Sequence, residues 1–185
     1  MPVTVPTRVE HEIVPAPGAS LRLKVVKTGL FSGRKHIFSF PRFQGVVRFD
    51  GDRPADSSVE LEIDARALVV EDDWVSNKDR AKIKEYTEQQ MLDVARHPVL
   101  RFASSAVEAA GNRIRVSGAL TVRGVTRPVE VALVLREASE EGLVLEGYAI
   151  FPMTQFGLTP PSAAFGAIGT RDEMEFEFVL KTRPR

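Results

Sequence analysis

Apolar and polar residues alternate one by one through most of the chain, which is the period of a β-strand with one buried face. The clearest case runs from Val59 to Ala67, where apolar side chains alternate with Glu60, Glu62, Asp64 and Arg66. The same alternation recurs in residues 21–25, 36–40, 113–123, 129–135, 143–151 and 173–181. The pattern predicts about eight strands and a mainly β protein.

The segments between these predicted strands are short and rich in turn-forming residues. Asp50-Gly51-Asp52, Gly111-Asn112 and Glu141-Gly142 are of the type that connects neighbouring strands in hairpins. An antiparallel meander follows, and it can close either as a two-sheet sandwich or as an up-and-down barrel. A barrel of eight strands has an interior that is either filled by side chains or able to hold one small ligand.

One long segment between strands, Asp72 to Pro98, departs from the alternation. Its apolar residues, among them Ile83, Tyr86 and Met91, recur at helical spacing. We expect one or two helical turns near Trp74 and an amphipathic helix from about Asp79 to Gln90 or Val94, ending before Pro98. The acidic run 71–73 is interpreted as the N-terminal cap of this helical segment, because it lacks the spacing of a calcium loop.

The stretch from Phe151 to Thr170, FPMTQFGLTPPSAAFGAIGT, contains no charged side chain. Its three prolines and three glycines exclude a membrane-spanning helix. We expect it to link the last two strands across an apolar opening, where a charge would be costly to desolvate. Phe156, Leu158 and Phe165 would then face a bound apolar molecule.

The first twenty residues contain four prolines and are predicted to form an extended N-terminal arm, followed by a single domain over residues 21–185. They lack the basic start and apolar run of a signal peptide. We therefore expect a cytoplasmic protein, or a periplasmic one if a leader has been removed.

Charge and composition exclude several classes of function. The chain has 25 basic and 25 acidic residues, so its net charge does not draw it to nucleic acid or to an anionic membrane. It contains no cysteine, which excludes disulfides, thiolate metal sites and cysteine nucleophiles. These observations favour a small apolar partner over a polyanion.

The sequence offers no convincing catalytic or metal-binding arrangement. His11, His36 and His97 are not spaced as zinc ligands, and no G-x-S-x-G nucleophile motif is present. Most carboxylates fall on outward strand positions, where solvation explains them. We expect no catalytic residue, no metal and no cofactor.

Four local strings resemble the YceI-like family of lipid-binding proteins. The closest is GALTVRGVTRPVEVAL (Gly118 to Leu133), which is similar to a hairpin of that family. TQFGL (Thr154 to Leu158), QMLDVARHPVLRFAS (Gln90 to Ser104) and GLFSGRKHIFSFPRFQGVVRFD (Gly29 to Asp50) are also similar to family segments, although Thr154, Met91 and His97 depart from the usual residues. The resemblance covers roughly Leu21 to Lys181.

The resemblance implies a lipocalin-like eight-stranded antiparallel barrel with an inserted α-helix that binds a long-chain isoprenoid or fatty ligand without covalent chemistry. We expect the ligand to be lined by Phe31, His36, Phe38, Phe40, Phe43, Trp74, Met91, Phe102, Leu120, Val122, Phe151, Phe156, Leu158 and Phe165. Arg34, Lys35, His36 and Arg42 are candidate donors to a polar headgroup. A homodimer is compatible with the sequence.

Two other functions are kept as alternatives. A barrel filled by side chains would serve as a protein-interaction module through an exposed apolar patch. A lipocalin-like enzyme acting on a bound lipid is the third, and it is disfavoured because no paired acid, base or nucleophile is evident.

Overall fold

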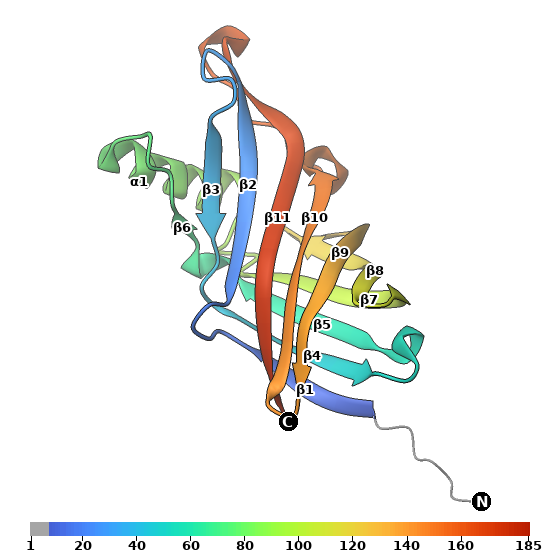
Figure 1. Ribbon diagram of the computed structural model, residues 1–185. Coiled ribbons are helices and arrows are strands. Elements are labelled where there is room, and N and C mark those ends of the chain that lie inside the picture. The colour runs from blue at the N-terminus through green and yellow to red at the C-terminus, as the bar shows by residue number, and fades with distance from the viewer. Residues whose placement is uncertain (1–7) are drawn as a thin grey trace, which may run out of the picture.

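In the computed structural model, residues 8–185 are described, and the alternating segments form one antiparallel sheet of eleven strands (Figure 1). The strands are β1 (Arg8–Val14), β2 (Ser20–Gly29), β3 (Lys35–Ser39), β4 (Phe43–Asp50), β5 (Ser58–Asp64), β6 (Val69–Val70), β7 (Val99–Ala110), β8 (Arg113–Val122), β9 (Val125–Ser139), β10 (Gly142–Pro152) and β11 (Ile168–Pro184). Every pairing between them is antiparallel.

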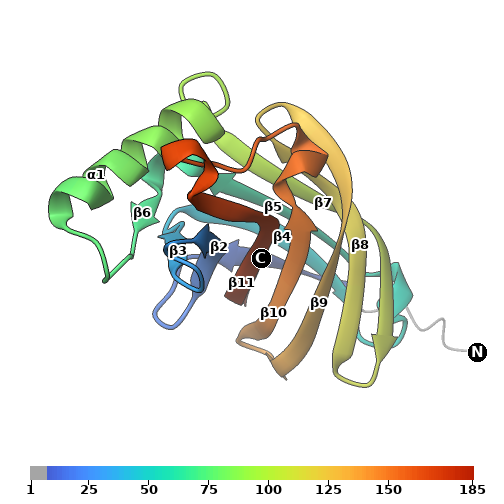
Figure 2. The same ribbon diagram turned by 90° about the horizontal axis from the view of Figure 1, so that it is seen from above.

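Eight of these strands close into a ring in the order β1-β4-β5-β7-β8-β9-β10-β11, because β1 pairs with β4 on one side and with β11 on the other. Figure 2 shows how the wall from β4 to β11 curves around the interior. The structure thus confirms the eight-stranded antiparallel barrel. The remaining strands extend this wall, since β2 pairs with the first part of β11 and carries β3 and β6.

The strand that closes the ring lies within the segment expected to be an arm. Arg8–Val14 pairs along its length with β4, and His11 and Ile13 are buried. Its alternation of Val9, His11 and Ile13 with Glu10 and Glu12 is a strand signal, and Pro15 ends the pairing because proline lacks an amide donor. The first seven residues of the predicted arm lie outside the described residues.

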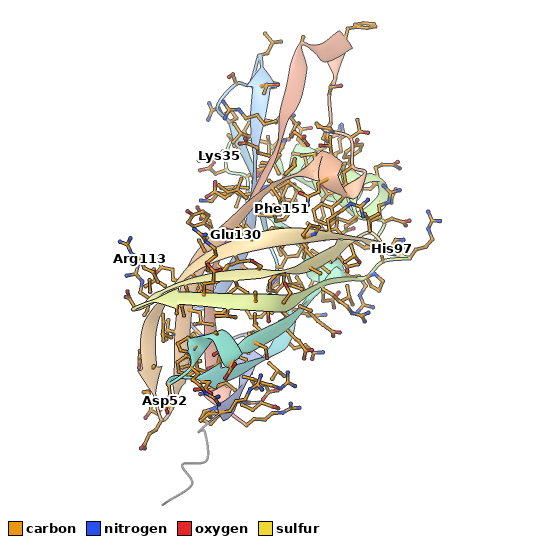
Figure 3. All side chains as sticks on the ribbon, turned by 90° about the vertical axis from the view of Figure 1, so that its right-hand side faces the viewer. Lys35, Asp52, His97, Arg113, Glu130 and Phe151 are labelled. Atoms are coloured by element: carbon orange, nitrogen blue, oxygen red, sulfur yellow. The ribbon has the colours of Figure 1, made fainter. Side chains whose placement is uncertain are left out.

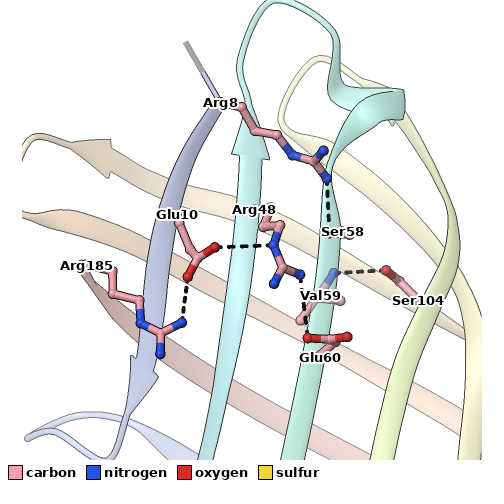
Figure 4. A network of polar contacts seen from close by, with 8 residues as sticks. All are labelled: Arg8, Glu10, Arg48, Ser58, Val59, Glu60, Ser104 and Arg185. Carbon is pink, nitrogen blue, oxygen red and sulfur yellow. Dashed lines mark hydrogen bonds and ion pairs between the residues drawn. The ribbon is translucent and has the colours of Figure 1, made fainter. Parts of the chain in front are cut away.

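Ion pairs on the outer surface join β1 to its neighbours (Figure 4). Glu10 lies between Arg185 and Arg48, at 2.5 Å and 3.3 Å, and Arg48 continues to Glu60 on β5. The hydrogen bond from Arg185 lowers the pKa of the Glu10 carboxyl, and Arg48 adds to this effect. Exposed pairs of this kind stabilise a fold only slightly, so they orient β1 against its neighbours but contribute little to the stability of the barrel.

The inserted helix α1 runs from Asn77–Tyr86 and continues as a wider turn over Thr87–Met91, close to the predicted span. Ser76 caps its N-terminus by accepting a hydrogen bond from the Asp79 amide. The predicted helical turns near Trp74 are absent from the described chain, where residues 73–75 form bends. The expectation that the acidic run caps the helix is wrong, because Asp72 instead binds β3.

Among residues 8–185, no helix has the length and apolar character that crossing a bilayer would require.

Candidate functional site

The ring of strands encloses an apolar cavity. The volume in which the centre of a water-sized molecule fits is about 130 Å³. Its wall consists of inward side chains from β4, β5 and β7 to β11, such as Leu61, Val116 and Leu145. Among the described residues, none that lines the cavity is charged, and Ser57 and Ser58 are the only polar residues in the lining. The cavity therefore suits a molecule without charge along its length.

Period-two alternation produces this wall. Val129, Val131, Leu133 and Leu135 on β9 all point inward, and the cavity is lined in the same way by alternate residues of β10 and β11. On β8, Gly118 leaves room for the Phe102 ring, because a Cβ at that position would come within 2.5 Å of it. The missing side chain thus allows one more aromatic ring to face the interior.

The cavity is open at the end where β4 meets β5. Phe49, Pro54, Ser57 and Ser58 line it there, and each is partly exposed. The turns between β7 and β8 and between β9 and β10 lie at this same end, as the pairing registers show. The two serines therefore mark the mouth, and each hydroxyl already has a partner, since Ser57 Oγ accepts from the Asp50 amide at 3.0 Å and Ser58 Oγ accepts from Arg8 at 3.3 Å.

The opposite end is closed by aromatic side chains. Phe151 and Phe176 line the cavity and stack on each other, with ring centroids 5.9 Å apart. Behind them lie Phe156 and Phe40, each 1% exposed. Together the four rings form a floor, which we call the aromatic floor (Phe40, Phe151, Phe156, Phe176).

The uncharged stretch supplies half of this floor. After β10, residues Met153–Phe156 form a short turn that ends at Gly157, whose φ of 73° is readily adopted by glycine. The turn is fixed by Thr154, which donates through its amide and hydroxyl to the Asp172 carboxylate at 2.9 and 2.6 Å. It thereby buries Phe156 and Leu158 in the barrel end, so this part of the stretch acts as a plug.

The predicted ligand-lining residues fall into three groups. Three of them line the cavity, namely Phe102, Leu120 and Phe151. Six are buried in the core but away from the cavity, namely Phe38, Phe40, Phe43, Val122, Phe156 and Leu158. Five lie at least partly exposed and outside it, namely Phe31, His36, Trp74, Met91 and Phe165. Phe165 is fully exposed, so the expected opening around it is not part of this cavity.

The candidate headgroup donors Arg34, Lys35, His36 and Arg42 do not line the cavity. Figure 3 shows Lys35 in the upper part of the molecule, below the end of the finger, and Asp52, beside the mouth, near the bottom. The residues chosen from the sequence are mostly aromatic and include, of the aliphatic wall, only Leu120. The alternation of β9, β10 and β11 identifies the residues of the wall as inward, but it does not show that they surround a cavity.

A second group of polar and aromatic side chains lies on β3, outside the cavity. His36 Nδ1 is 2.6 Å from the buried Asp72 carboxylate, which also accepts a hydrogen bond from the Ile37 amide at 2.7 Å. Trp74 stacks on His36 and donates its indole N–H to the Lys35 carbonyl. These contacts attach the segment before α1 to the sheet. Residues 8–185 contain no group of three or more carboxylate and histidine side chains placed to hold a metal ion.

Comparison with known proteins gives a consistent result. The profile of the YceI-like domain matches residues 17–182. A UPF0312 protein of Pseudomonas syringae pv. syringae is 31% identical over 94 residues, 50% of this chain and 45% of that protein. Protein YceI of Salmonella paratyphi B is 29% identical over 91 residues, 49% of this chain and 44% of that one. These alignments span somewhat under half the length of the curated relatives.

Solved structures share the fold. Burkholderia cenocepacia BcnA has a TM-score of 0.70 at 19% identity, over 89% of this chain and 96% of that one. A polyisoprenoid binding domain from Saccharophagus degradans has a TM-score of 0.65 at 13% identity, over 96% of this chain and 99% of that one. At these identities the likeness shows the fold alone.

Proposed function

Since this chain belongs to the YceI-like family, we propose that it binds a long apolar molecule, of polyisoprenoid or fatty-chain type, inside its barrel and without covalent chemistry. The observation that carries the proposal is the apolar wall of the cavity, with its two polar residues at the mouth. The solved domain described as polyisoprenoid binding, which shares this fold, supports the same class of ligand.

Burial alone supplies the binding free energy in this proposal. Removing apolar surface from water contributes about 25 cal/mol per Å², or roughly 0.8 kcal/mol per methylene group, before the ligand's ordering is subtracted. An apolar chain would enter at the mouth and extend toward Phe151, while a hydroxyl or carboxyl end stays near Ser57 and Ser58. No acid, base or nucleophile is required, and the protein would act as a carrier or sequestering protein.

Lipid extraction and native mass spectrometry of protein purified without detergent test this directly. We expect one apolar chain per protein. A purified protein that is empty and that also fails to bind the apolar fluorophore N-phenylnaphthylamine would show the proposal to be wrong.

A matched pair of variants on β10 tests whether the ligand occupies the cavity. Ala149 is buried and lines it, whereas Ile150, the next residue, is 52% exposed. Ala149→Phe should fill part of the cavity and weaken fluorophore binding by at least about tenfold, a change of about 1.4 kcal/mol. Ile150→Phe should bind as the unmodified protein does, and equal binding by both variants would place the ligand elsewhere.

A further inference from the structure

The strands β2 and β3 and the first part of β11 project beyond the barrel as a finger, seen at the top of Figure 1. Gly29 pairs with Ile168, and the Leu30 amide donates to the Ala167 carbonyl at 2.9 Å. Two loops that are far apart in the sequence therefore meet at the end of the finger. We call these loops, residues 30–34 and 163–167, the fingertip.

The fingertip exposes large apolar side chains. Phe165 is fully exposed, Leu30 is 76% exposed and Phe31 is 43% exposed. The other large apolar residues exposed in the described chain are divided among β1, β6, α1 and β10. Phe31 also packs against Trp74, with ring centroids 5.8 Å apart. Two adjoining loops thus bring three exposed apolar side chains to one end of the finger, a feature that marks an interaction surface.

The backbone of the fingertip holds Phe165 outward in an unfavourable conformation. Ala164 and Phe165 have φ values of 51° and 56°, a left-handed region that residues other than glycine, asparagine and aspartate rarely adopt. Strain of this kind persists where the surrounding structure imposes it, and here two hydrogen bonds between Ala163 and Ile168 close the loop. The loop therefore presents the phenylalanine to the exterior at an energetic cost.

The fingertip loops and β3 carry basic and no acidic residues, whereas on β11 Asp172 and Glu173 directly follow Arg171. Arg34 and Lys35 are exposed, and Arg171 lies on β11 just below the tip. No aspartate or glutamate occurs between Ile13 and Phe49, or between Gly147 and Arg171. Of the acids in the segment that leads to α1, Asp72 is buried against His36 and Glu71 pairs with Arg22, while Asp73 is exposed.

We propose that the fingertip docks on the surface of an anionic lipid bilayer. Leu30, Phe31 and Phe165 would enter the interfacial layer, and Arg34 and Lys35 would face the lipid phosphates. Apolar side chains beside basic ones are the combination that binds such surfaces, since burial and attraction to anionic headgroups then act together. The absence of acidic residues in both loops favours this partner over a protein surface of mixed charge.

Vesicle flotation with the full chain tests the proposal. We expect binding to vesicles of phosphatidylcholine containing about a quarter phosphatidylglycerol, and at least about tenfold weaker binding to phosphatidylcholine alone. High salt should weaken the binding, because it screens exposed charges. Binding to neither vesicle, or equal binding to both, would overturn the proposal.

Two variants at the fingertip and the start of β3 locate the contact. Phe165→Asn removes the ring while retaining a residue that accepts a left-handed backbone, and the double variant Arg34→Gln/Lys35→Gln removes the charges. Each should weaken binding to the anionic vesicles at least about tenfold. The matched control Ile150→Asn changes an exposed apolar residue on β10 and should leave binding unchanged.

Two further measurements exclude other occupants and separate this proposal from the cavity ligand. Sedimentation velocity tests whether the protein self-associates. Self-association that Phe165→Asn abolishes, without vesicle binding, would overturn the proposal and identify the fingertip as a contact between two copies. The cavity variant Ala149→Phe should bind vesicles normally. Failure of the cavity proposal would thus leave the docking result intact, and the reverse also holds.

Discussion

The ring of Phe151 packs edge-on against the ring of Phe156, with 5.4 Å between their centroids and 64° between their planes. Phe151 lines the cavity, and Phe156 lies behind it on the plug formed by the β10–β11 connection. The pair therefore joins the closed end of the barrel to the floor of the cavity. The stability of the fold and the length of the cavity both depend on this contact.

Phe156→Ala should destabilise the protein strongly. The side chain is 1% exposed, and removing it leaves a void that the turn around Gly157 cannot fill. We expect a loss of about 3–5 kcal/mol in the free energy of unfolding, measured by urea denaturation. Phe165→Asn is the control, because that ring is exposed and its removal should change stability by less than about 0.5 kcal/mol. Equal stability of the two variants would contradict the role of Phe156 as a plug.

Phe151→Ala should lengthen the cavity at its floor. If the ligand's apolar end lies against this ring, the variant gains affinity for longer fatty chains relative to shorter ones. Leu145→Ala is the matched control, since Leu145 lines the wall and its removal widens the cavity without extending it. Competition of a fatty-acid series against N-phenylnaphthylamine measures the preference. An unchanged ranking of chain lengths in Phe151→Ala would show that the floor does not limit the ligand.

Much of the fold could be predicted from the sequence, because each barrel strand has one buried and one solvated face. The alternation of Leu61 and Ile63 with Glu62, for instance, appears unchanged in the burial of β5. The closing strand β1 was harder to recognise, since its inward positions include His11 and prolines flank it. Its pairing depends on the free edges of β4 and β11, which are brought together only by the closure of the whole sheet.

The lining of the cavity is harder to predict from the sequence than the fold, for a physical reason. Alternation identifies which face of a strand is buried, but it does not distinguish residues around a cavity from residues packed against each other. Phe40 and Leu145 are both inward and apolar, yet only Leu145 lines the cavity. The basic charge of the fingertip likewise could not be predicted from the net charge of zero, because a balance over 185 residues does not show how charge is distributed in one hairpin.

Asp72→Ala should loosen the segment before α1. The Asp72 side chain has no exposed surface. It accepts a hydrogen bond from the Ile37 amide and pairs with His36 Nδ1 at 2.6 Å. Its loss leaves these buried groups without their partner, which costs about 1–3 kcal/mol in the free energy of unfolding.

Trp74 provides a local readout for the same variant. It is the only tryptophan of the chain and stacks on His36, with ring centroids 5.4 Å apart. We expect its fluorescence emission to shift to longer wavelength in Asp72→Ala, because the freed segment exposes the indole to water. Asp73→Ala alters the exposed neighbour and should leave the emission unchanged. An identical spectrum in both variants would show that Asp72 does not hold Trp74.

His11 should make the stability of the barrel depend on pH. The side chain is 4% exposed on β1, with Thr182 Oγ1 at 3.3 Å from Nδ1, and burial lowers the pKa of its imidazole below the ordinary value of 6.5. The folded protein therefore keeps this histidine neutral, while the unfolded chain takes up a proton as the pH falls through about 6.5. Proton uptake favours the unfolded state. His11 therefore leaves the free energy of unfolding unchanged above that pH and lowers it increasingly as the pH falls below it.

The free energy of unfolding should thus fall with decreasing pH, by at most about 1.4 kcal/mol per pH unit for this one group. Urea denaturation between about pH 7.5 and about pH 5.5, roughly one unit on either side of the ordinary histidine pKa, measures the change. His11→Gln cannot titrate, and its stability should vary less over the same interval, whatever its absolute value. The carboxyls of Glu10, Asp64 and Glu177 have lowered pKa values and weaken the fold only at more acidic pH, so they do not obscure the comparison. Equal slopes for the two proteins would mean that His11 is protonated alike in the folded and unfolded states, and that β1 does not shield it from water.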